Sequence, residues 1–505
     1  MGLATVYCRD PMLYPIHKPM NLTFVEKEPG KAYVADKLWL PKSGVREGPV
    51  KTALEFSVNT SKGMQIIRMW GESKNHIICP REFIPASQYT NYKFPFIDLR
   101  PQFQKVNFID GVTPRDEEQQ KAWNAFAMND NGILNLGCGK GKTRLAIKKI
   151  AQKGVPTLVI VPDGGILTQW KEAILGDKKR GMKPAIGFDG DLGLIQGPVF
   201  NWAKPITLAL VTTLWMRIEN GAVPEELFRY FGLVVYDEVH QIGAPKFSLT
   251  ATPFYGDRIG LTATVQREDG LDPIYRYHLG EPFYSDLTQD LVPRIYFQKT
   301  PTNFDDTPAK NENNITNISL LRSMLGMNLE SNTFRYWSIK QALDAGRKVL
   351  CLGHSLSQLK LFHAMFPGSG LIIGDTPKDD RMKILRESQV CFAIARLGSQ
   401  GVDDDALDTL FWLTPFRSKI ALQQSMGRIQ RRRPGKKTPV MTVFEDANIR
   451  PLRALCQSIR HSLKEWKFSF ETVIPEKLPT ELPASVKRKY DEVLSQLSPD
   501  EVDDE

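Results

Sequence analysis

Residues 133–143 read Ile-Leu-Asn-Leu-Gly-Cys-Gly-Lys-Gly-Lys-Thr, so an apolar run passes directly into a glycine-rich turn. Residues 144–150, Arg-Leu-Ala-Ile-Lys-Lys-Ile, then have a helical pattern. Glycines let the backbone wrap round a phosphate with its N–H groups pointing inward, and the N-terminal end of the next helix adds positive potential. The pattern therefore predicts a phosphate-binding loop made of Gly137, Cys138, Gly139, Lys140, Gly141, Lys142 and Thr143.

This loop matches the pattern G-x-x-x-x-G-K-[ST] except at its first position, where Leu136 stands in place of glycine. Lys142 can reach the β- and γ-phosphates of a nucleotide, and the Thr143 hydroxyl can ligate Mg²⁺. The alternative is a glycine-rich turn without a ligand. Its place between a strand and a helix favours the nucleotide site.

A second apolar run ends in two carboxylates, in the sequence Gly232-Leu-Val-Val-Tyr-Asp-Glu-Val-His240. Ligands of a parallel sheet bind at the carboxyl ends of its strands. Asp237 is therefore predicted to hold Mg²⁺, and Glu238 to polarise the attacking water as the catalytic base. An Asp-Glu pair at a strand end can also be a solvated turn, but the preceding phosphate loop favours the catalytic interpretation.

Short buried runs alternate with helical patterns along most of the chain, which predicts an α/β fold with parallel sheets covered on both faces. Two α/β domains are expected, at residues 106–295 and 318–450, separated by a polar linker around 301–317. A small α+β module, 1–105, precedes them, and a helical extension with an acidic tail, 451–505, follows. The runs lie at 133–136, 157–161, 206–211, 233–236, 259–261, 348–352, 371–373, 390–395, 409–413 and 440–444.

The composition of the 505 residues excludes general disorder and a membrane-spanning protein. Apolar residues make up 42% of the chain, and no stretch approaches the roughly 18–20 apolar residues that a membrane span needs. No secretory signal or other targeting signal is visible, so we expect a soluble intracellular protein, in the cytoplasm or in a viral or host compartment. A net charge of +9 fits a polyanionic partner as well as it fits a mildly basic, solvated surface.

An arginine-rich segment, Gln424-Ser-Met-Gly-Arg-Ile-Gln-Arg431, lies in the second α/β domain. Arg428 and Arg431 are three residues apart, so on a helix they would project from one face. Two guanidinium groups placed in this way suit a γ-phosphate, as arginine fingers do. A solvated face or a nucleic-acid patch is the other interpretation of such a run.

Taken in this order, these segments resemble the motifs of superfamily 2 DExH-box helicases and translocases. The resemblance implies two RecA-like domains that bind ATP and Mg²⁺ between them and act on nucleic acid. The matching segments are Gly137–Thr143 (motif I), 159–162 with 169–170 (Ia), 211–213 (backbone-contacting), Asp237–His240 (II), Leu261–Thr264 (III), Lys348–Ser355 (IV), Gly401–Asp403 (V) and Gln424–Arg431 (VI, Q-x-x-G-R-x-x-R).

The resemblance also assigns roles to residues outside the catalytic set of Lys142, Asp237, Glu238, Arg428 and Arg431. It implies that Gln119 and Gln424 contact ATP, although the Arg-x-x-Gln spacing before the loop is shifted by one residue after Arg115. It implies that closure of the domains is coupled to nucleic acid through His240, Thr262, Thr264 and Asp403, and that Thr212 and Thr213 hold phosphates. Thr-Ala-Thr also occurs at 250–252, but the copy at 262–264 has the motif III spacing.

Within the superfamily, Asp237–Ala244 and the Arg267-Glu-Asp269 triplet resemble the XPB branch. The size and the single N-terminal module are similar to phage UvsW-type and poxvirus transcript-release helicases. These resemblances imply an ATP-dependent helicase or translocase that unwinds DNA or remodels branched junctions, with DNA favoured over RNA as the partner. The alternatives are a duplex translocase or annealing motor, an RNA transcript-release helicase, a binding module with a relic ATPase fold, and the motor subunit of a restriction system.

The N-terminal module contains aromatic and basic residues with two interpretations: Trp70, Tyr89, Tyr92, Lys93, Phe94, Phe96 and Arg100. They could stack on bases and contact phosphates. They could equally form the core and rim of a small domain, which the pattern favours.

Overall fold

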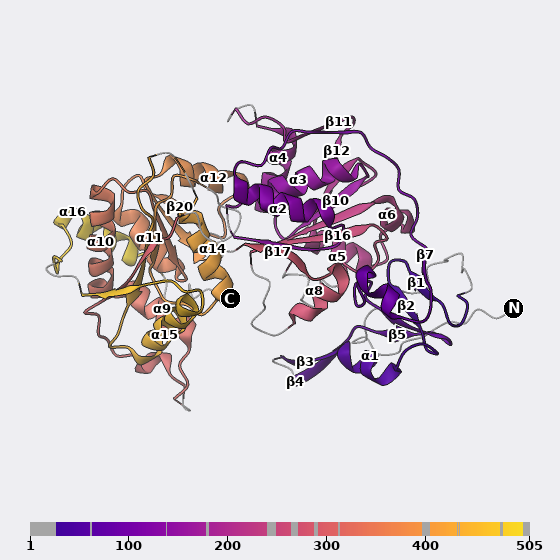
Figure 1. Ribbon diagram of the computed structural model, residues 1–505. Coiled ribbons are helices and arrows are strands. Elements are labelled where there is room, and N and C mark those ends of the chain that lie inside the picture. Colours follow the sequence, from indigo (N-terminus) through magenta and orange to yellow (C-terminus); the bar gives the residue numbers. More distant parts are fainter. Residues whose placement is uncertain are drawn as a thin grey trace. The chain divides into compact units, whose positions relative to one another are not determined.

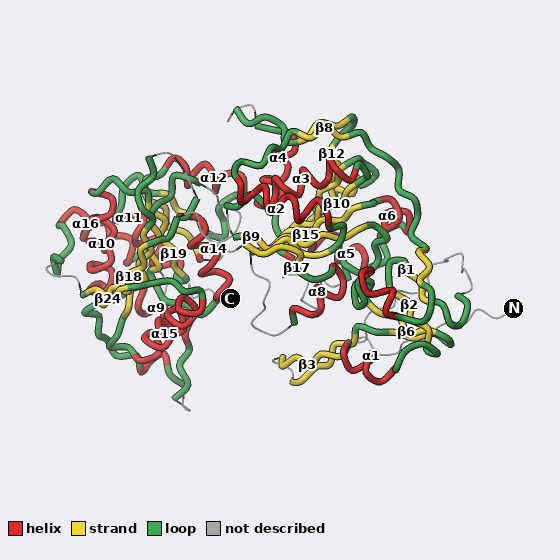
Figure 2. Tube along the Cα trace, in the orientation of Figure 1, coloured by secondary structure: helices red, strands yellow, loops and turns green. Residues whose placement is uncertain are grey.

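The computed structural model describes residues 27–60, 63–137, 139–177, 181–239, 249–263, 271–286, 291–311, 314–395, 404–431, 433, 435–474 and 478–497. The chain forms two compact units, Met1–Leu287 and Thr288–Glu505. In each unit helices cover both faces of a mainly parallel sheet, as Figures 1 and 2 show. No described helix is long and apolar enough to cross a bilayer.

The first unit is organised around an eight-stranded sheet with the order β13-β12-β14-β10-β15-β16-β9-β17. All neighbours pair in parallel except β12 and β13. The predicted apolar runs coincide with β9, β10, β14, β15 and β16. The strands are β9 (Gly132–Leu136), β10 (Thr157–Val161), β12 (Leu192–Gln196), β13 (Val199–Asn201), β14 (Ile206–Leu210), β15 (Leu233–Asp237), β16 (Asp257–Thr262) and β17 (Pro282–Asp286).

Two apolar cores bury the faces of this sheet. One includes side chains of α2 (Glu117–Met128), α3 (Lys142–Lys153) and α4 (Gly164–Leu175). The other includes side chains of α5 (Val211–Glu219), α6 (Glu225–Tyr230) and α8 (Asp272–Leu279). The central strands are buried along their length, which is why their sequences are continuous apolar runs without alternation.

The N-terminal residues add a five-stranded mixed sheet with the order β5-β6-β2-β1-β7. This part is α+β, as the sequence predicts. Its elements are β1 (Ala32–Val34), β2 (Leu38–Pro41), α1 (Glu47–Ala53), the hairpin β3 (Glu55–Thr60) and β4 (Gly63–Arg68), β5 (Gly71–Glu72), β6 (His76–Cys79), η1 (Ala86–Asn91) and β7 (Phe96–Asp98), followed by β8 (Phe108–Asp110), which pairs with β11 (Ile186–Phe188).

Two buried arginines join this small sheet to the rest of the first unit. Arg258 of β16 donates to the backbone carbonyl of Asp36 at 2.7 Å. Arg81 donates to the carbonyl of Tyr255 at 2.9 Å and to the side chain of Asn131 at 3.0 Å. Burying a guanidinium is costly unless its N–H groups have partners, so these contacts hold the N-terminal sheet in a defined place.

The aromatic side chains of the N-terminal module form its core, which favours the second interpretation of those residues. Phe94 is buried, and the rings of Tyr89 and Phe96 stack with centroids 3.8 Å apart. Arg100 pairs with Asp98 and Asp257 at 2.8 and 2.9 Å.

The second unit contains a seven-stranded, fully parallel sheet with the order β20-β21-β19-β22-β23-β18-β24. The five predicted runs of this half coincide with β19 to β23. The sheet also includes two strands outside the predicted range 318–450, namely β18 and β24. The strands are β18 (Arg294–Lys299), β19 (Val349–Gly353), β20 (Gly370–Ile372), β21 (Val390–Ile394), β22 (Thr409–Trp412), β23 (Val440–Glu445) and β24 (Glu471–Val473).

The structure corrects the prediction of a polar linker around 301–317. Described residues of this segment pack inside the second unit. Ala309, in η4 (Thr307–Ala309), is 2% exposed and shares an apolar cluster with side chains of α9 and α15. The helix α16, which follows the predicted domain end at 450, also packs on the core of this unit. Its Tyr490 hydroxyl donates to the carbonyl of Met327 at 2.9 Å. The helices are α9 (Ile318–Met327), α10 (Leu329–Asp344), α11 (Leu356–Met365), α12 (Lys378–Glu387), α14 (Lys419–Ile429), α15 (Arg450–Glu465) and α16 (Ala484–Leu494).

Candidate active site

The predicted phosphate loop connects the end of β9 to the start of α3. Gly139 and Gly141 have left-handed backbones, with φ of 79° and 81°. A Cβ atom on Gly141 would lie 2.2 Å from Nε2 of Gln119, so this position needs glycine. Leu136, the departure from the loop pattern, is the buried last residue of β9, and its carbonyl accepts a hydrogen bond from Lys142 Nζ at 3.0 Å.

Two residues upstream hold the loop from one side. The Gln119 amide accepts the N–H of Arg115 at 2.8 Å and donates to the carbonyl of Lys140 at 3.1 Å. The Arg115 guanidinium donates to the carbonyl of Gly139 at 3.1 Å. Gln119 therefore lies against the phosphate loop, as expected of a nucleotide-contacting residue, although its role in reading the base stays a prediction.

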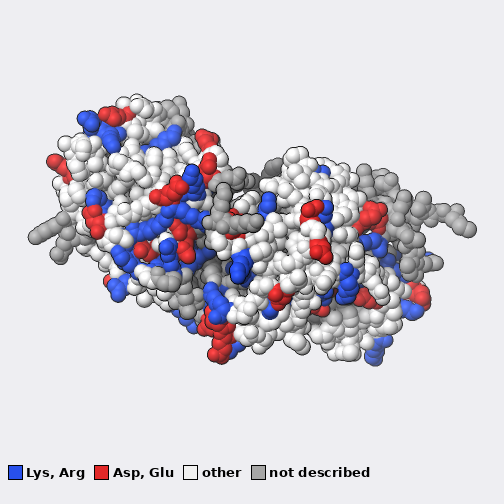
Figure 3. Space-filling view, turned by 90° about the horizontal axis from the view of Figure 1, so that it is seen from above, with Lys and Arg blue, Asp and Glu red and all other residues white. Residues whose placement is uncertain are grey.

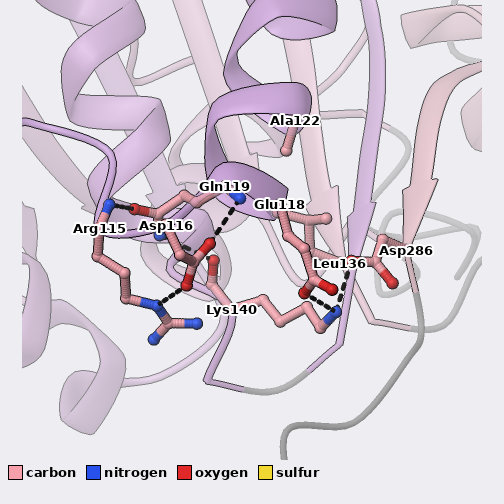
Figure 4. Close-up of a pocket in the computed structure, with 8 residues that line it drawn as sticks. All are labelled: Arg115, Asp116, Glu118, Gln119, Ala122, Leu136, Lys140 and Asp286. Carbon is pink, nitrogen blue, oxygen red and sulfur yellow. Dashed lines mark hydrogen bonds and ion pairs between the residues drawn. The ribbon is translucent and has the colours of Figure 1, made fainter.

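A small pocket opens beside this contact, and Figure 4 shows its lining. Lys140 extends across it toward Asp286, the last residue of β17, and forms an ion pair with that carboxylate. Glu118 is a second, more exposed partner at 3.5 Å. The pocket is lined by Arg115, Asp116, Glu118, Gln119, Ala122, Leu136, Lys140 and Asp286.

The two predicted acidic residues lie at the carboxyl end of β15. Asp237 accepts the indole N–H of Trp170 at 2.8 Å and the backbone N–H of Glu238 at 3.0 Å. Trp170 is fully buried in α4, so its indole holds the Asp237 carboxylate in a fixed position at the end of β15. Trp170 lies in the segment that resembles motif Ia, but no pattern in the sequence predicts its hydrogen bond to Asp237.

Glu238 has a left-handed backbone, with φ of 50°. A residue with a side chain pays a conformational cost there, and such strain is frequent at functional sites. Because β15 ends at Asp237, this left-handed turn lies directly after the end of the strand.

Burial and the neighbouring charge of Glu238 raise the pKa of Asp237 to about 6. The hydrogen bond from Trp170 and the positive charge of Lys142 act in the opposite direction. Lys142 is therefore close enough to interact with Asp237 electrostatically, which brings the phosphate loop and the acidic pair into one site.

The sheet register explains this proximity. Asp237 is paired with Leu261, and Thr262 with Asn135, so β15, β16 and β9 end at the same edge of the sheet. Thr262 is the buried last residue of β16. This strand end agrees with the choice of the second Thr-Ala-Thr copy.

The donor set at this edge fits Mg²⁺. Hydroxyl and carboxylate oxygens are its preferred ligands, and it is usually held by one or two carboxylates together with substrate phosphates. Thr143 lies in the first turn of α3, and Asp237 offers a carboxylate at the same edge of the sheet. Among the described residues no cluster of three or more His, Cys, Asp or Glu side chains could hold a metal without such a substrate.

Thr212 and Thr213, the predicted phosphate contacts, lie in the first turn of α5 directly after β14. Thr212 is exposed, whereas the Thr213 hydroxyl accepts the N–H of Gly197 at 3.2 Å. Because β14 runs parallel to β10, α5 begins at the sheet edge that also contains the phosphate loop.

In the second unit, Gln424 and Arg428 lie on α14. The helix ends at Ile429, so Arg431 follows it, and the prediction that both arginines project from one helix is wrong in this detail. The chain next reads Arg433-Pro434-Gly435, and a proline disfavours helical backbone in the residue before it.

Four predicted site residues lie outside the described residues: Cys138, His240, Thr264 and Asp403. The Arg267-Glu-Asp269 triplet lies outside them as well.

The chain is similar to known helicases and to one restriction-enzyme family model. Residues 112–267 match the family model described as "Type III restriction enzyme, res subunit". A protein of Acanthamoeba polyphaga mimivirus, named as an ATP-dependent RNA helicase, is 24% identical over 470 residues, which cover 87% of this chain and 84% of that protein. The DNA 3'-5' translocase XPB2 of Sulfurisphaera tokodaii is 33% identical over 184 residues, 36% of this chain and 38% of that protein.

Among solved structures, S. cerevisiae Dbp5 bound to RNA and ADP BeF3 is similar in fold, with a TM-score of 0.50 at 12% identity. The similarity covers 75% of this chain and 93% of that one, and it identifies the two sheets as tandem RecA-like domains.

Fold, site and comparisons together support an ATP-dependent nucleic-acid helicase or translocase, and the chain resembles superfamily 2 helicases. Within that class the chain resembles the XPB branch and viral helicases, as the sequence motifs predict. Its match to XPB2 spans well under two thirds of that relative's length.

Proposed function

We propose that this chain is an ATP-driven helicase or translocase that acts on DNA, unwinding duplexes or remodelling branched junctions. The observation that carries the proposal is that the phosphate loop with Lys142 follows β9 at the same edge of the sheet at which Asp237 ends β15. The choice of DNA is supported by the 33% identity to a protein named as a DNA translocase.

In this proposal the first unit binds ATP and activates water. Lys142 holds the β- and γ-phosphates, Thr143 and Asp237 hold Mg²⁺, and Glu238 accepts the proton of the attacking water. Mg²⁺ supplies neutralisation of the charge that develops on the phosphate oxygens. Glu238 follows Asp237 in a left-handed turn, and the proposal assigns the base to Glu238 and the metal to Asp237.

The second unit is proposed to supply Gln424, Arg428 and Arg431 to the nucleotide when the two units close. Closure is proposed to be transmitted to nucleic acid through His240, Thr262, Thr264 and Asp403, while Thr212 and Thr213 hold backbone phosphates. Alternating closure and opening would then move the protein along a strand. Phosphate contacts carry no base information, so binding is expected to be independent of sequence and sensitive to salt.

A second candidate is an RNA helicase, for example one that releases transcripts. The specific observation that favours it is the 470-residue match to a mimivirus protein named as an RNA helicase, which covers most of both chains.

The deciding experiment is steady-state ATPase turnover with no polymer, single-stranded DNA, duplex DNA, branched DNA and RNA. Glu238→Gln is the control, because it removes the proposed base while keeping the shape of the side chain. Strongest stimulation by duplex or branched DNA supports the proposal. Strongest stimulation by RNA replaces it with the second candidate, and turnover indifferent to every polymer rejects both.

A strand-displacement assay beside a triplex-displacement assay separates unwinding from translocation. Displacement of a duplex strand supports a helicase. Displacement of the third strand of a triplex without strand separation identifies a duplex translocase or annealing motor instead.

A further inference from the structure

Helix α15 (Arg450–Glu465) has one face buried in the second unit and one face open to solvent. Its buried side chains pack into two apolar clusters of that unit. They are Leu452, Leu455, Cys456, Ile459 and Leu463. Because the apolar face of α15 is buried inside the second unit, its solvent-exposed face is the part that can contact a partner.

The open face has a continuous line of five long polar side chains: Arg450, Arg453, Gln457, His461 and Lys464. All five are exposed. Their spacing of three, four, four and three residues keeps them on one face of a helix. At 1.5 Å per residue the line is about 21 Å long.

The arginines and the lysine of this line lack acidic partners among the described residues, whereas His461 lies 3.4 Å from Glu465. Among the described residues, no Asp or Glu lies within ion-pair distance of Arg450, Arg453 or Lys464. The nearby Glu465 is already paired with Lys419 at 2.8 Å, and Arg460, at the border of the face, with Glu445 at 2.7 Å. The acidic charges next to the line are therefore neutralised, and the three cations are available to an anion.

Other charged surfaces of the chain differ from this one. On α16 (Ala484–Leu494), Lys487 and Arg488 pair with Asp491 and Glu492 at 2.6 and 3.7 Å. On the face of the molecule in Figure 3, basic and acidic side chains lie next to one another. The line on α15, which is labelled in Figure 1, thus differs from these two surfaces in containing basic charge alone.

We infer that the open face of α15 binds the phosphate backbone of a nucleic-acid strand. It would be a contact separate from the strand-end residues Thr212 and Thr213 of the first unit, and it rests on the proposed function in that the partner is the nucleic acid on which the motor acts. Arginine and lysine on a rigid helix, without aromatic side chains between them, suit phosphates and not bases. An anionic membrane is disfavoured because an interfacial helix must insert an apolar face, and that of α15 is buried.

The test is the salt dependence of nucleic-acid binding, measured by fluorescence anisotropy between about 50 and 200 mM salt. The triple variant Arg450→Gln/Arg453→Gln/Lys464→Gln loses three cations at exposed positions. Each phosphate contact adds about 0.7 to the slope of log K against log salt for a single strand and about 0.9 for a duplex. The variant should therefore lose about 2–3 from the slope and bind about 10²-fold more weakly near 0.1 M salt.

The matched control is Lys487→Gln/Arg488→Gln/Lys489→Gln on α16, which changes the net charge equally but removes cations of which two have acidic partners. It should keep the wild-type slope. Equal slopes for wild type and the α15 variant, or equal losses in both triple variants, would overturn the inference. So would preferential binding of the wild type to vesicles with about one third anionic lipid over nucleic acid.

ATPase turnover separates this inference from the proposed function. The α15 variant should keep its basal turnover without polymer and need about 10²-fold more polymer for half-maximal stimulation. If wild-type turnover responds to a polymer but the α15 variant responds at the same concentration, the inference alone fails. If wild-type turnover responds to no polymer, the proposed function fails.

Discussion

Asp286 holds the phosphate loop at two points, through Lys140 in its middle and through the backbone of Gly137 at its start. The Lys140 ammonium lies 2.5 Å from the Asp286 carboxylate, and the Asp286 carbonyl accepts the Gly137 N–H at 2.9 Å. The two side chains are 6% and 14% exposed, so the pair is shielded from water. The last residue of β17 thus sets the shape of a loop that lies about 150 positions earlier in the sequence.

Asp286→Asn is expected to destabilise the first unit, because it leaves the buried Lys140 ammonium without its main counter-charge. Breaking such a pair costs about 3 kcal/mol, whereas replacing both partners by apolar residues can be neutral. Urea unfolding should therefore show a lower midpoint for Asp286→Asn and a recovered midpoint for Lys140→Met/Asp286→Leu. The single variant should also raise the KM for ATP about tenfold, equivalent to about 1.4 kcal/mol, with a smaller effect on kcat.

The exposed pair of Lys340 and Asp344 on α10 is the matched control. Asp344→Asn should change stability by under about 1 kcal/mol, because water screens an exposed ion pair. If Asp286→Asn is no more harmful than Asp344→Asn, the loop does not depend on this contact.

Asp237→Asn is expected to stabilise the nucleotide-free protein while removing ATP hydrolysis. The pKa of Asp237 is raised to about 6 from 3.8, so the folded protein binds this proton more tightly than the unfolded chain does. The ionised carboxyl therefore costs stability, from nothing below about pH 4 to its full value above about pH 6. The gain from Asp237→Asn should accordingly be small at pH 4 and reach about 1–2 kcal/mol at pH 7.

Thermal unfolding of both proteins across this pH range gives the measurement. The amide can still accept the N–H of Trp170, so the packing at the end of β15 is preserved. A variant that is less stable than wild type at pH 7 would show that Asp237 contributes to the fold and not mainly to the chemistry.

Glu238→Gln is expected to bind ATP with near wild-type affinity and to hydrolyse it at least about 10²-fold more slowly, the size of effect typical of losing a general base. Lys142→Ala should instead weaken ATP binding itself, because its side chain is the proposed phosphate contact. Fluorescent-nucleotide titration beside turnover separates the two effects. Normal turnover in Glu238→Gln would assign the base to another residue.

Arg428→Ala tests the second unit. An arginine finger stabilises the charge that develops in the transition state. The rate of ATP hydrolysis should therefore fall about 10³-fold while nucleotide affinity stays largely intact. Arg433→Ala is a control outside the motif, since Arg433 is exposed and pairs with Asp405 at 3.3 Å. A loss of under tenfold for Arg428→Ala would remove it from the catalytic set.

Lys467→Gly is expected to stabilise the second unit by about 1 kcal/mol. Lys467 follows the end of α15 with a left-handed backbone, φ of 60°, a position that usually contains glycine. Lys464→Gln removes one charge nearby without relieving the backbone and should give no such gain. Urea unfolding of the wild type, Lys467→Gly and Lys464→Gln measures the three stabilities. A less stable Lys467→Gly would mean that the favourable lysine charge at the helix end outweighs the backbone strain.

The sequence predicted the two sheets well because buried parallel strands are apolar along their whole length. β10 begins and ends at the predicted residues, and β15 differs by one. The phosphate loop and the acidic pair were also predicted, since each combines a strand end with residues of one chemistry. Trp170 and Asp286 were not, because their contacts are made by chain folding and leave no local pattern.

The segments that were misjudged are polar in sequence but packed in space. Residues 301–317 suggested a linker, yet Ala309 is buried in an apolar cluster. β18 alternates buried and more exposed residues, and β24 is a three-residue strand at one edge of the second sheet, so both have a weak apolar signal. Arg431 was placed on a helix by spacing alone, whereas the following Pro434 favours an earlier helix end.

The position of β18 in the second sheet constrains how the chain acquires its structure during synthesis. Arg294 of β18 pairs with Val440 of β23, and Tyr296 pairs with Glu471 of β24. Both partners of this early strand leave the ribosome late, so it must wait with unsatisfied backbone groups while the first unit can already fold. Pairings between such distant segments form slowly and expose strand edges to aggregation. Nascent chains stalled before β23 should therefore bind chaperones strongly, and release should follow once β24 has emerged.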